Sequence, residues 1–451
     1  MDILANIRQS KMTWFQNRTV ALALVLVLVD GFDVAVMAFA APALSAEWSI
    51  DPVTLGYLLS AGLIGMAAGS IFLTPLADRI GRRPLALLGM GIVTIGMVGA
   101  LLSTDVPQLI AFRIITGIGV GGMTATLNVL VAEFSSDKRR GTVMGIYAAG
   151  FGIGATLCGI FAGLFIPRFG WQSIFIVGAV VSALLLIASL KMLPESLDFL
   201  VNKRPANAME KINALLGSMG QVKIDELPPV PLQQTRQGVV KEVFAGSAGF
   251  RTIMLWVGYG LLTSGYYFAN TWTPKIMATA SGDKSLGVTV GTIVNFGGII
   301  GCLVFGLVAV FIRSRILLTI TLFAAAVSFV VFAQVMHLSA PAIGVAFVLG
   351  LLTTAGLAGF YALSPELYSP QARVTGTGWM IGSGRLVSIA APILVGYLIS
   401  GGWAAKSIFP LFAGALVLSA VAVIALSMSQ RKAGPAATEG TLAPQELSAG
   451  S

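Results

Sequence analysis

The chain has 451 residues, of which 56% are hydrophobic and only 10% are charged, and its formal net charge is +9. Soluble domains contain about 25% charged residues, so this composition excludes an ordinary soluble protein. Apolar runs of roughly 20 residues, the length of one transmembrane helix, recur along the chain, and the alternating segments of about 10 residues that typify a β-barrel are missing. We therefore predict an all-α membrane protein.

Twelve apolar runs are long enough to span a bilayer, six before and six after a polar segment at 193–249. This segment contains a Pro-Pro-Val-Pro run at 228–231 and a predicted short surface helix at 205–216. The predicted domains are an N-terminal six-helix half (1–192), a cytoplasmic central loop (193–249), a C-terminal six-helix half (250–428) and a disordered cytoplasmic tail (429–451). The predicted spans are 19–43, 53–75, 84–103, 108–133, 141–165, 171–192, 250–277, 286–311, 315–336, 341–363, 374–400 and 404–428.

The first span contains two carboxylates, Asp30 and Asp33, inside an otherwise apolar run. A charge at the bilayer centre costs at least about 2.5–3.5 kcal/mol, so acids in this position are functional by default. The i, i+3 spacing places both on one helix face, and the helical rise places them near mid-bilayer. The two residues predict a proton-coupling site, with a fixed buried ion pair as the alternative. We favour Asp33 as the proton carrier because it lies farther from the cytoplasmic entry.

Two arginines also lie inside spans. Arg113, in the fourth span, can pair with an aspartate of the first span and is assigned to the proton-coupling site, with a purely structural tie as the alternative. Arg385, in the eleventh span, has no acid in its own span. A guanidinium group binds a carboxylate through two parallel hydrogen bonds. We therefore predict that Arg385 binds a substrate carboxylate, the alternative being an acid in another helix.

The two halves of the sequence repeat. A single offset of 233 residues aligns Glu133 with Glu366, Arg82 with Arg315, and Arg140 with Arg373. Matches at equivalent places in two six-span halves are typical of transporters built from parallel repeats. Basic residues gather in alternate loops, so the positive-inside rule places both termini in the cytoplasm.

Charged residues gather at the predicted cytoplasmic helix ends. They predict an inner gate that holds the outward-facing state and separates when the protein switches. A carboxylate in this cluster, Asp78, could also cap the N-terminus of the eleventh span, where the helix dipole favours negative charge. The alternative is that these charges serve only topology and solvation. The predicted gating residues are Asp78, Arg82, Glu133, Glu366 and Arg373.

Residues 69–84 contain Ala-Asp-Arg-Ile-Gly-Arg-Arg-Pro, which resembles the loop motif of the major facilitator superfamily. Within that superfamily, Asp-Gly-Phe-Asp at 30–33 resembles the Asp-Gly-x-Asp motif of the aromatic acid:proton symporter family. The resemblance covers residues 19–428 and implies a major facilitator fold. It also implies proton-coupled import of a small aromatic carboxylate such as a hydroxybenzoate, for aromatic hydrocarbon catabolism, across the bacterial inner membrane.

An aromatic substrate needs an apolar slot or a π-face, and amide groups can bind ring hydroxyls. Any one of the candidate side chains serves more often in packing than in contact with a ligand. With Arg385, the predicted substrate-binding residues are Phe32, Tyr266, Trp272, Asn295 and Trp379. The wider set of candidates is Tyr57, Tyr147, Tyr267, Asn270, Phe296 and Tyr361.

Three alternatives remain. The same fold could import another organic anion, such as muconate, shikimate or a hydroxyphenylpropionate. It could act as a drug:proton antiporter, although the fifth span lacks the Gly-Pro usual there. It could also be a receptor derived from a carrier. The sequence contains no phosphate loop, zinc motif or catalytic triad, so we expect no enzyme activity, cofactor, metal or nucleic-acid partner, and we expect a monomer.

Overall fold

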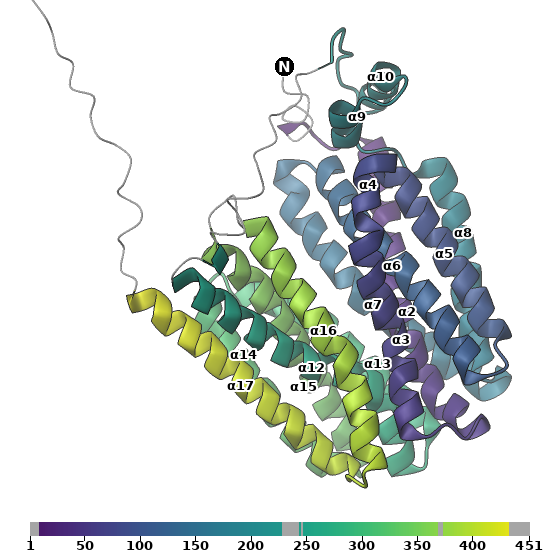
Figure 1. Ribbon diagram of the computed structural model, residues 1–451, viewed down its shortest axis with the longest axis vertical. Helices are drawn as coiled ribbons and strands as arrows, with labels where there is room; N and C mark the ends of the chain where they lie inside the picture. Colours follow the sequence, from purple (N-terminus) through teal and green to yellow (C-terminus); the bar gives the residue numbers. More distant parts are fainter. Residues whose placement is uncertain (1–8, 228–242, 245–246, 369–372, 433–451) are drawn as a thin grey trace, which may run out of the picture.

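The structure, a computed structural model, describes residues 9–227, 243–244, 247–368 and 373–432 (Figure 1). Every regular element in these ranges is a helix. The first half contains α2 (Trp14–Glu47), α3 (Pro52–Phe72), α4 (Thr74–Ile80), α5 (Arg82–Leu102), α6 (Val106–Phe134), α7 (Asp137–Phe169) and α8 (Gln172–Met192). The second half contains α12 (Ser247–Ser281), α13 (Lys284–Val308), α14 (Ser314–Val335), α15 (Ser339–Leu363), α16 (Arg373–Ser400) and α17 (Ala405–Lys432), with a 3-10 turn at Ser364–Leu367.

Eleven helical stretches of the described chain are long and apolar enough to cross a bilayer, and they coincide with eleven of the predicted spans. The remaining predicted span, 250–277, lies within α12, a helix of 35 residues that is not among these eleven stretches. Tyr266, Tyr267 and Asn270 lower its hydropathy. Because α12 packs against α2, α13, α16 and α17, protein rather than lipid surrounds much of its polar surface.

The central segment differs from its prediction. The helix expected at 205–216 begins later, as α10 (Ala208–Ser218), because Asn207 adopts a left-handed conformation with φ of 60°. A further helix, α9 (Leu197–Lys203), precedes it and was not predicted. The Pro-Pro-Val-Pro run and most of the expected tail lie outside the described residues, and α17 continues to Lys432, past the expected start of the tail at 429.

The two halves use the same packing scheme. In the first half α2 packs on α7, α3 on α6, and α5 on α8. In the second half the equivalent helices form the pairs α12–α16, α13–α15 and α14–α17. The crossing of α3 and α6 depends on a helix surface without side chains: a Cβ on Gly65 of α3 would collide with the carbonyl oxygen of Ile114 in α6. Small residues let helices approach closely where hydrophobic burial alone cannot hold them together.

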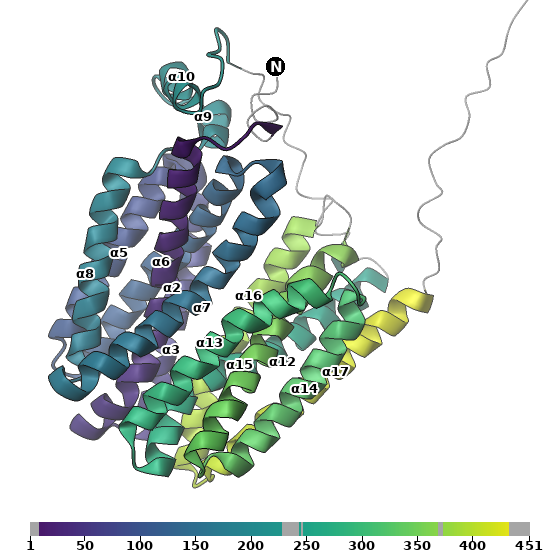
Figure 2. The ribbon, with the colours of Figure 1, turned by 180° about the vertical axis from the view of Figure 1, so that it is seen from behind.

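The halves meet through α3 with α16, α7 with α13, and α2 with α12. They are inclined to one another and spread apart toward the end of the molecule where α9 and α10 lie (Figures 1 and 2). Hydrogen bonds between the halves, among described residues, lie from the middle of the helices toward the opposite end. They join Tyr57 to Tyr397, Ser60 to Ile389, Lys275 to Ser45, and Arg385 to both Met66 and Ser70.

Candidate functional site

Asp33 and Arg113 form a buried ion pair inside the first half. Asp33 is 0% and Arg113 is 1% exposed. The guanidinium Nη1 lies 2.5 Å from Asp33 Oδ1, and Nη2 lies 3.2 Å from Oδ2 and 2.6 Å from the Asp33 backbone carbonyl oxygen. Gly62 of α3 leaves the room that the guanidinium occupies. Both carboxylate oxygens are therefore bound to a cation, which makes Asp33 a fixed partner of Arg113.

Asp30, one helical turn away, has a different environment. Its Oδ1 has no hydrogen-bond partner among the described residues although it is buried. Its Oδ2 lies 3.1 Å from the hydroxyl of Thr124, which also lies 2.8 Å from the carbonyl oxygen of Val120. A hydroxyl has one hydrogen, so Thr124 can donate to a charged Asp30, or donate to Val120 and accept from a protonated Asp30. This contact is compatible with both protonation states of Asp30.

Arg385 reaches from α16 of the second half toward the first half. Its Nη1 donates to the carbonyl oxygen of Met66 at 2.9 Å and to the hydroxyl of Ser70 at 2.7 Å, both in α3. Its other N–H groups make no hydrogen bond with a described residue. Its charge acts on Asp30 across the interface, but the two side chains form no ion pair within 4.0 Å in the described part of the chain. Arg385 therefore has guanidinium donors without a partner among the described residues, and it lies near enough to Asp30 for its charge to act on that acid.

Four tyrosines of the second half lie close to one another, and three of them lie near Arg385. The hydroxyls of Tyr259 in α12 and Tyr361 in α15 lie 3.0 Å apart. Tyr266 and Tyr267 meet edge to face, with ring centroids 5.2 Å apart. The charge on Arg385 acts on Tyr259, Tyr267 and Tyr361. Tyr259 was not among the predicted substrate residues, although it lies seven residues before Tyr266 and so shares its helix face.

A small cavity lies between the halves near these residues. It has a volume of about 10 Å³ and is lined by side chains of α2, α7, α12 and α13, including Tyr266, Asn270 and Asn295. This volume suffices for about one water molecule and not for an aromatic ring. Two predicted substrate residues, Tyr266 and Asn295, are thus brought together at the interface.

The other three predicted substrate residues lie elsewhere. Phe32 packs against Gly178 of α8 and lines an apolar groove with Val181. Trp272 is 1% exposed, and its indole N–H donates to the carbonyl oxygen of Pro392 at 3.1 Å, within the second half. Trp379 packs on Trp256 and Phe244, with ring centroids 6.1 and 5.6 Å apart. These contacts give all three aromatic residues a packing role in this arrangement.

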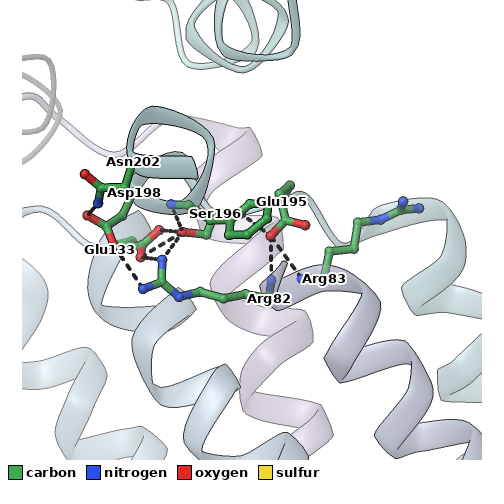
Figure 3. A network of polar contacts seen from close by, with 8 residues as sticks. Arg82, Arg83, Glu133, Glu195, Ser196, Asp198 and Asn202 are labelled. Atoms are coloured by element: carbon green, nitrogen blue, oxygen red, sulfur yellow. Dashed lines mark hydrogen bonds and ion pairs between the residues drawn. The ribbon is translucent and has the colours of Figure 1, made fainter. Parts of the chain in front are cut away.

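Of the predicted gating residues, Arg82 and Glu133 meet in a polar network within the first half (Figure 3). Arg82 Nη1 lies 2.6 Å from Glu133 Oε1 and also contacts the hydroxyl of Ser196, and Nη2 lies 3.0 Å from Asp198 Oδ2. Glu195 accepts the backbone N–H of Arg82 at 2.8 Å. The network ties the start of α5 and the end of α6 to the segment that begins α9.

The second half contains the equivalent pair. Arg315 Nη2 lies 3.3 Å from Glu366 Oε2, and this pair has the same sequence separation, 51 residues, as Arg82 and Glu133. Arg373 donates to the carbonyl oxygen of Pro365 at 3.0 Å. Asp78 is exposed and makes no ion pair with any described residue. None of these contacts joins the two halves. The gate and the helix cap by Asp78 therefore stay predictions for a different state, in which the ends of the two halves near these residues meet.

Two inclined halves with equivalent packing and a buried polar site at their interface are the architecture typical of multi-pass membrane transporters built from two repeats. The described residues contain no cluster of three or more His, Cys, Asp or Glu side chains that could hold a metal.

Comparisons with known proteins specify the family. Residues 23–354 match the sequence profile of the Major Facilitator Superfamily. The chain is 30% identical over 412 residues to the 4-hydroxybenzoate transporter PcaK of Pseudomonas aeruginosa, covering 89% of this chain and 90% of that protein. It is 28% identical over 437 residues to a gallate transporter of Pseudomonas putida, covering 94% of this chain and 96% of that one. The chain therefore belongs to the Major Facilitator Superfamily and is a transporter, not an enzyme.

A solved structure shows the same fold. The xylose transporter XylE of Escherichia coli, in a partially occluded inward-open conformation, superposes with a TM-score of 0.69 at 17% sequence identity, covering 90% of this chain and 98% of that one. This likeness supports the assignment of the fold alone.

Proposed function

We propose that this protein is a proton-coupled symporter that imports a small aromatic carboxylate across the bacterial cytoplasmic membrane, with both termini in the cytoplasm. The observation that supports it best is the placement of Asp30 and Arg385 on opposite sides of the interface without an ion pair between them. Asp30 has one carboxylate oxygen without a partner, and Arg385 has unused guanidinium donors. The relatives named as 4-hydroxybenzoate and gallate transporters support an aromatic acid as the transported class.

In this proposal the carboxylate of the substrate binds the free N–H groups of Arg385. The ring lies against the tyrosines around it, and the hydroxyls of Tyr259 and Tyr361 bind ring substituents. These hydroxyls already bond to each other at 3.0 Å, so both a donor and an acceptor are available. The cavity in the present arrangement is too small for the ring, so binding requires the halves to separate. Wider opening is the motion expected of two halves that rock about a central site.

The coupling follows from electrostatics. The positive charge of Arg385 stabilises the charged form of Asp30 as long as no other anion neutralises Arg385. When a substrate carboxylate binds Arg385, that support is lost and Asp30 takes up a proton. Substrate and proton thus bind together and leave together. We assign the proton to Asp30 rather than to Asp33, because both oxygens of Asp33 are held by Arg113.

Transport by reconstituted protein tests this proposal. Proteoliposomes that contain the protein should accumulate labelled 4-hydroxybenzoate when the outside is acidic, and an ionophore that collapses the proton gradient should abolish accumulation. Asp30→Asn should retain exchange of labelled for unlabelled substrate while losing gradient-driven accumulation. Asp137→Asn, which changes an exposed acid at the start of α7, is the matched control.

Two results would contradict the proposal. Uptake that is indifferent to the proton gradient rules out symport. Accumulation by Asp30→Asn at the wild-type level rules out Asp30 as the proton carrier. Arg385→Gln should raise the KM for 4-hydroxybenzoate about 10- to 100-fold, since a hydrogen bond to a charged group contributes roughly 1.5–3 kcal/mol.

A further inference from the structure

The internal repeat places two equivalent arginine–glutamate pairs at the same end of the molecule, but their surroundings differ. In the first half the side chains of Arg82 and Glu133 are 14% and 10% exposed, and Asp198 supplies a second carboxylate to Arg82. In the second half the side chains of Arg315 and Glu366 are 32% and 46% exposed. The first pair is therefore largely covered by protein, and the second is more exposed.

An open pocket of about 790 Å³ lies at the second pair. Arg313 and Arg315 line it together, and Glu366 is the one acid among the described residues that line it. The guanidinium group of Arg313 makes no hydrogen bond with a described residue, and that of Arg315 makes only its 3.3 Å contact with Glu366. The pocket therefore has an excess of positive charge and several unused guanidinium donors, which suit an anion with several oxygens.

The remaining wall of the pocket is mostly apolar, with three hydroxyl side chains among its residues, and it faces away from the other half. Ile320 of α14 and Ile424 and Met428 of α17 line it and are 56%, 38% and 56% exposed. These two helices run side by side along the outer side of the second half, and their principal contacts are with helices of that half (Figure 2). In a chain that spans a bilayer, such an exposed apolar surface contacts lipid acyl chains.

The connection between α13 and α14 completes the surroundings. Val310 and Phe311 also line the pocket and are 79% and 88% exposed. An exposed aromatic side chain beside two arginines, at a helix end, is the composition expected at the level of lipid headgroups. The pocket thus has a cationic end, which suits a lipid headgroup, and an apolar end, which suits the acyl chains.

We propose that this pocket binds one anionic phospholipid, with its phosphate on Arg313 and Arg315 and its acyl chains along α14 and α17. A soluble phosphate compound would use the arginines but leave the apolar wall unoccupied, whereas a lipid uses both. The phosphate gives Arg315 the second acceptor that Asp198 gives Arg82 in the first half. It also competes with Glu366 for Arg315, so the lipid acts on a predicted gating residue.

Lipid titration followed by native mass spectrometry of the purified protein tests this site. Phosphatidylglycerol should bind more tightly than phosphatidylcholine. Loss of each arginine should weaken phosphatidylglycerol binding about fivefold, and Arg313→Gln with Arg315→Gln about 25-fold, since a basic residue near an anionic lipid contributes roughly 1 kcal/mol. Arg139→Gln, an exposed arginine at the start of α7, should bind the lipid as the wild type does.

Two further variants separate the parts of the site. Ile424→Trp places a larger side chain on the apolar wall while both arginines remain, and it should weaken binding as well. Arg313→Lys with Arg315→Lys retains the charge and should keep most of the affinity, which distinguishes loss of the site from misfolding of the glutamine variant.

The proposal is overturned if the glutamine double variant or Ile424→Trp binds phosphatidylglycerol as the wild type does. It is also overturned if phosphatidylcholine binds equally well. Displacement of the lipid by glycerophosphoglycerol, the free headgroup, would identify a soluble phosphate site instead.

Discussion

The two aspartates of α2 should differ sharply in what their loss does to stability. Asp33→Asn leaves the guanidinium of Arg113, which is 1% exposed, without a counter-charge. Breaking a buried pair by removing one partner costs about 3–5 kcal/mol. Asp30→Asn keeps an oxygen that accepts from Thr124 and replaces an oxygen that has no partner, so it should cost about 1 kcal/mol or less.

Equilibrium unfolding in mixed detergent micelles, monitored by helical circular dichroism, measures both free energies of unfolding. The decisive variant is Asp33→Asn combined with Arg113→Gln. Because it removes the unpaired charge, it should be more stable than Asp33→Asn alone by about 2 kcal/mol, which is the non-additivity of a coupled pair. If the two single effects simply add, or if Asp30→Asn is as destabilising as Asp33→Asn, the distinction between a structural and a proton-binding aspartate is refuted.

The equivalent charge pairs should respond differently to loss of the arginine. Arg82→Gln removes contacts to two carboxylates and leaves the mostly buried Glu133 without a counter-charge, so it should lower the free energy of unfolding by roughly 2–4 kcal/mol. Arg315→Gln should lower it by about 1 kcal/mol or less, because its pair is exposed. Equal losses of unfolding free energy would contradict this prediction. The chain has 2 cysteines, of which Cys158 is buried and Cys302 partly exposed near Tyr266 and Tyr361. N-ethylmaleimide should therefore label Cys302 and not Cys158, as peptide mass mapping would show, and 4-hydroxybenzoate should slow the labelling; labelling at an unchanged rate would place the substrate away from Cys302.

The helical spans could be predicted from the sequence because a bilayer leaves few choices. A run of about 20 apolar residues without water must satisfy its backbone hydrogen bonds within the helix. The internal repeat was visible too, since the offset that aligns Arg82 with Arg315 also aligns Glu133 with Glu366, and the structure joins both pairs. The sequence likewise indicated that Asp30, Arg113 and Arg385 need partners, because unpaired charges in a membrane are costly.

Tertiary structure alone decided which partner each charge has. The i, i+3 spacing places Asp30 and Asp33 on one face but does not say which of them Arg113 reaches; the close crossing of α3 and α6 and the space at Gly62 decide it. Residue type alone also could not distinguish an aromatic residue at the interface site from one that only packs in the core. Trp272 and Tyr266 lie on the same helix six residues apart, and only the rotation of α12 against α16 sends Trp272 to Pro392 and leaves Tyr266 at the interface.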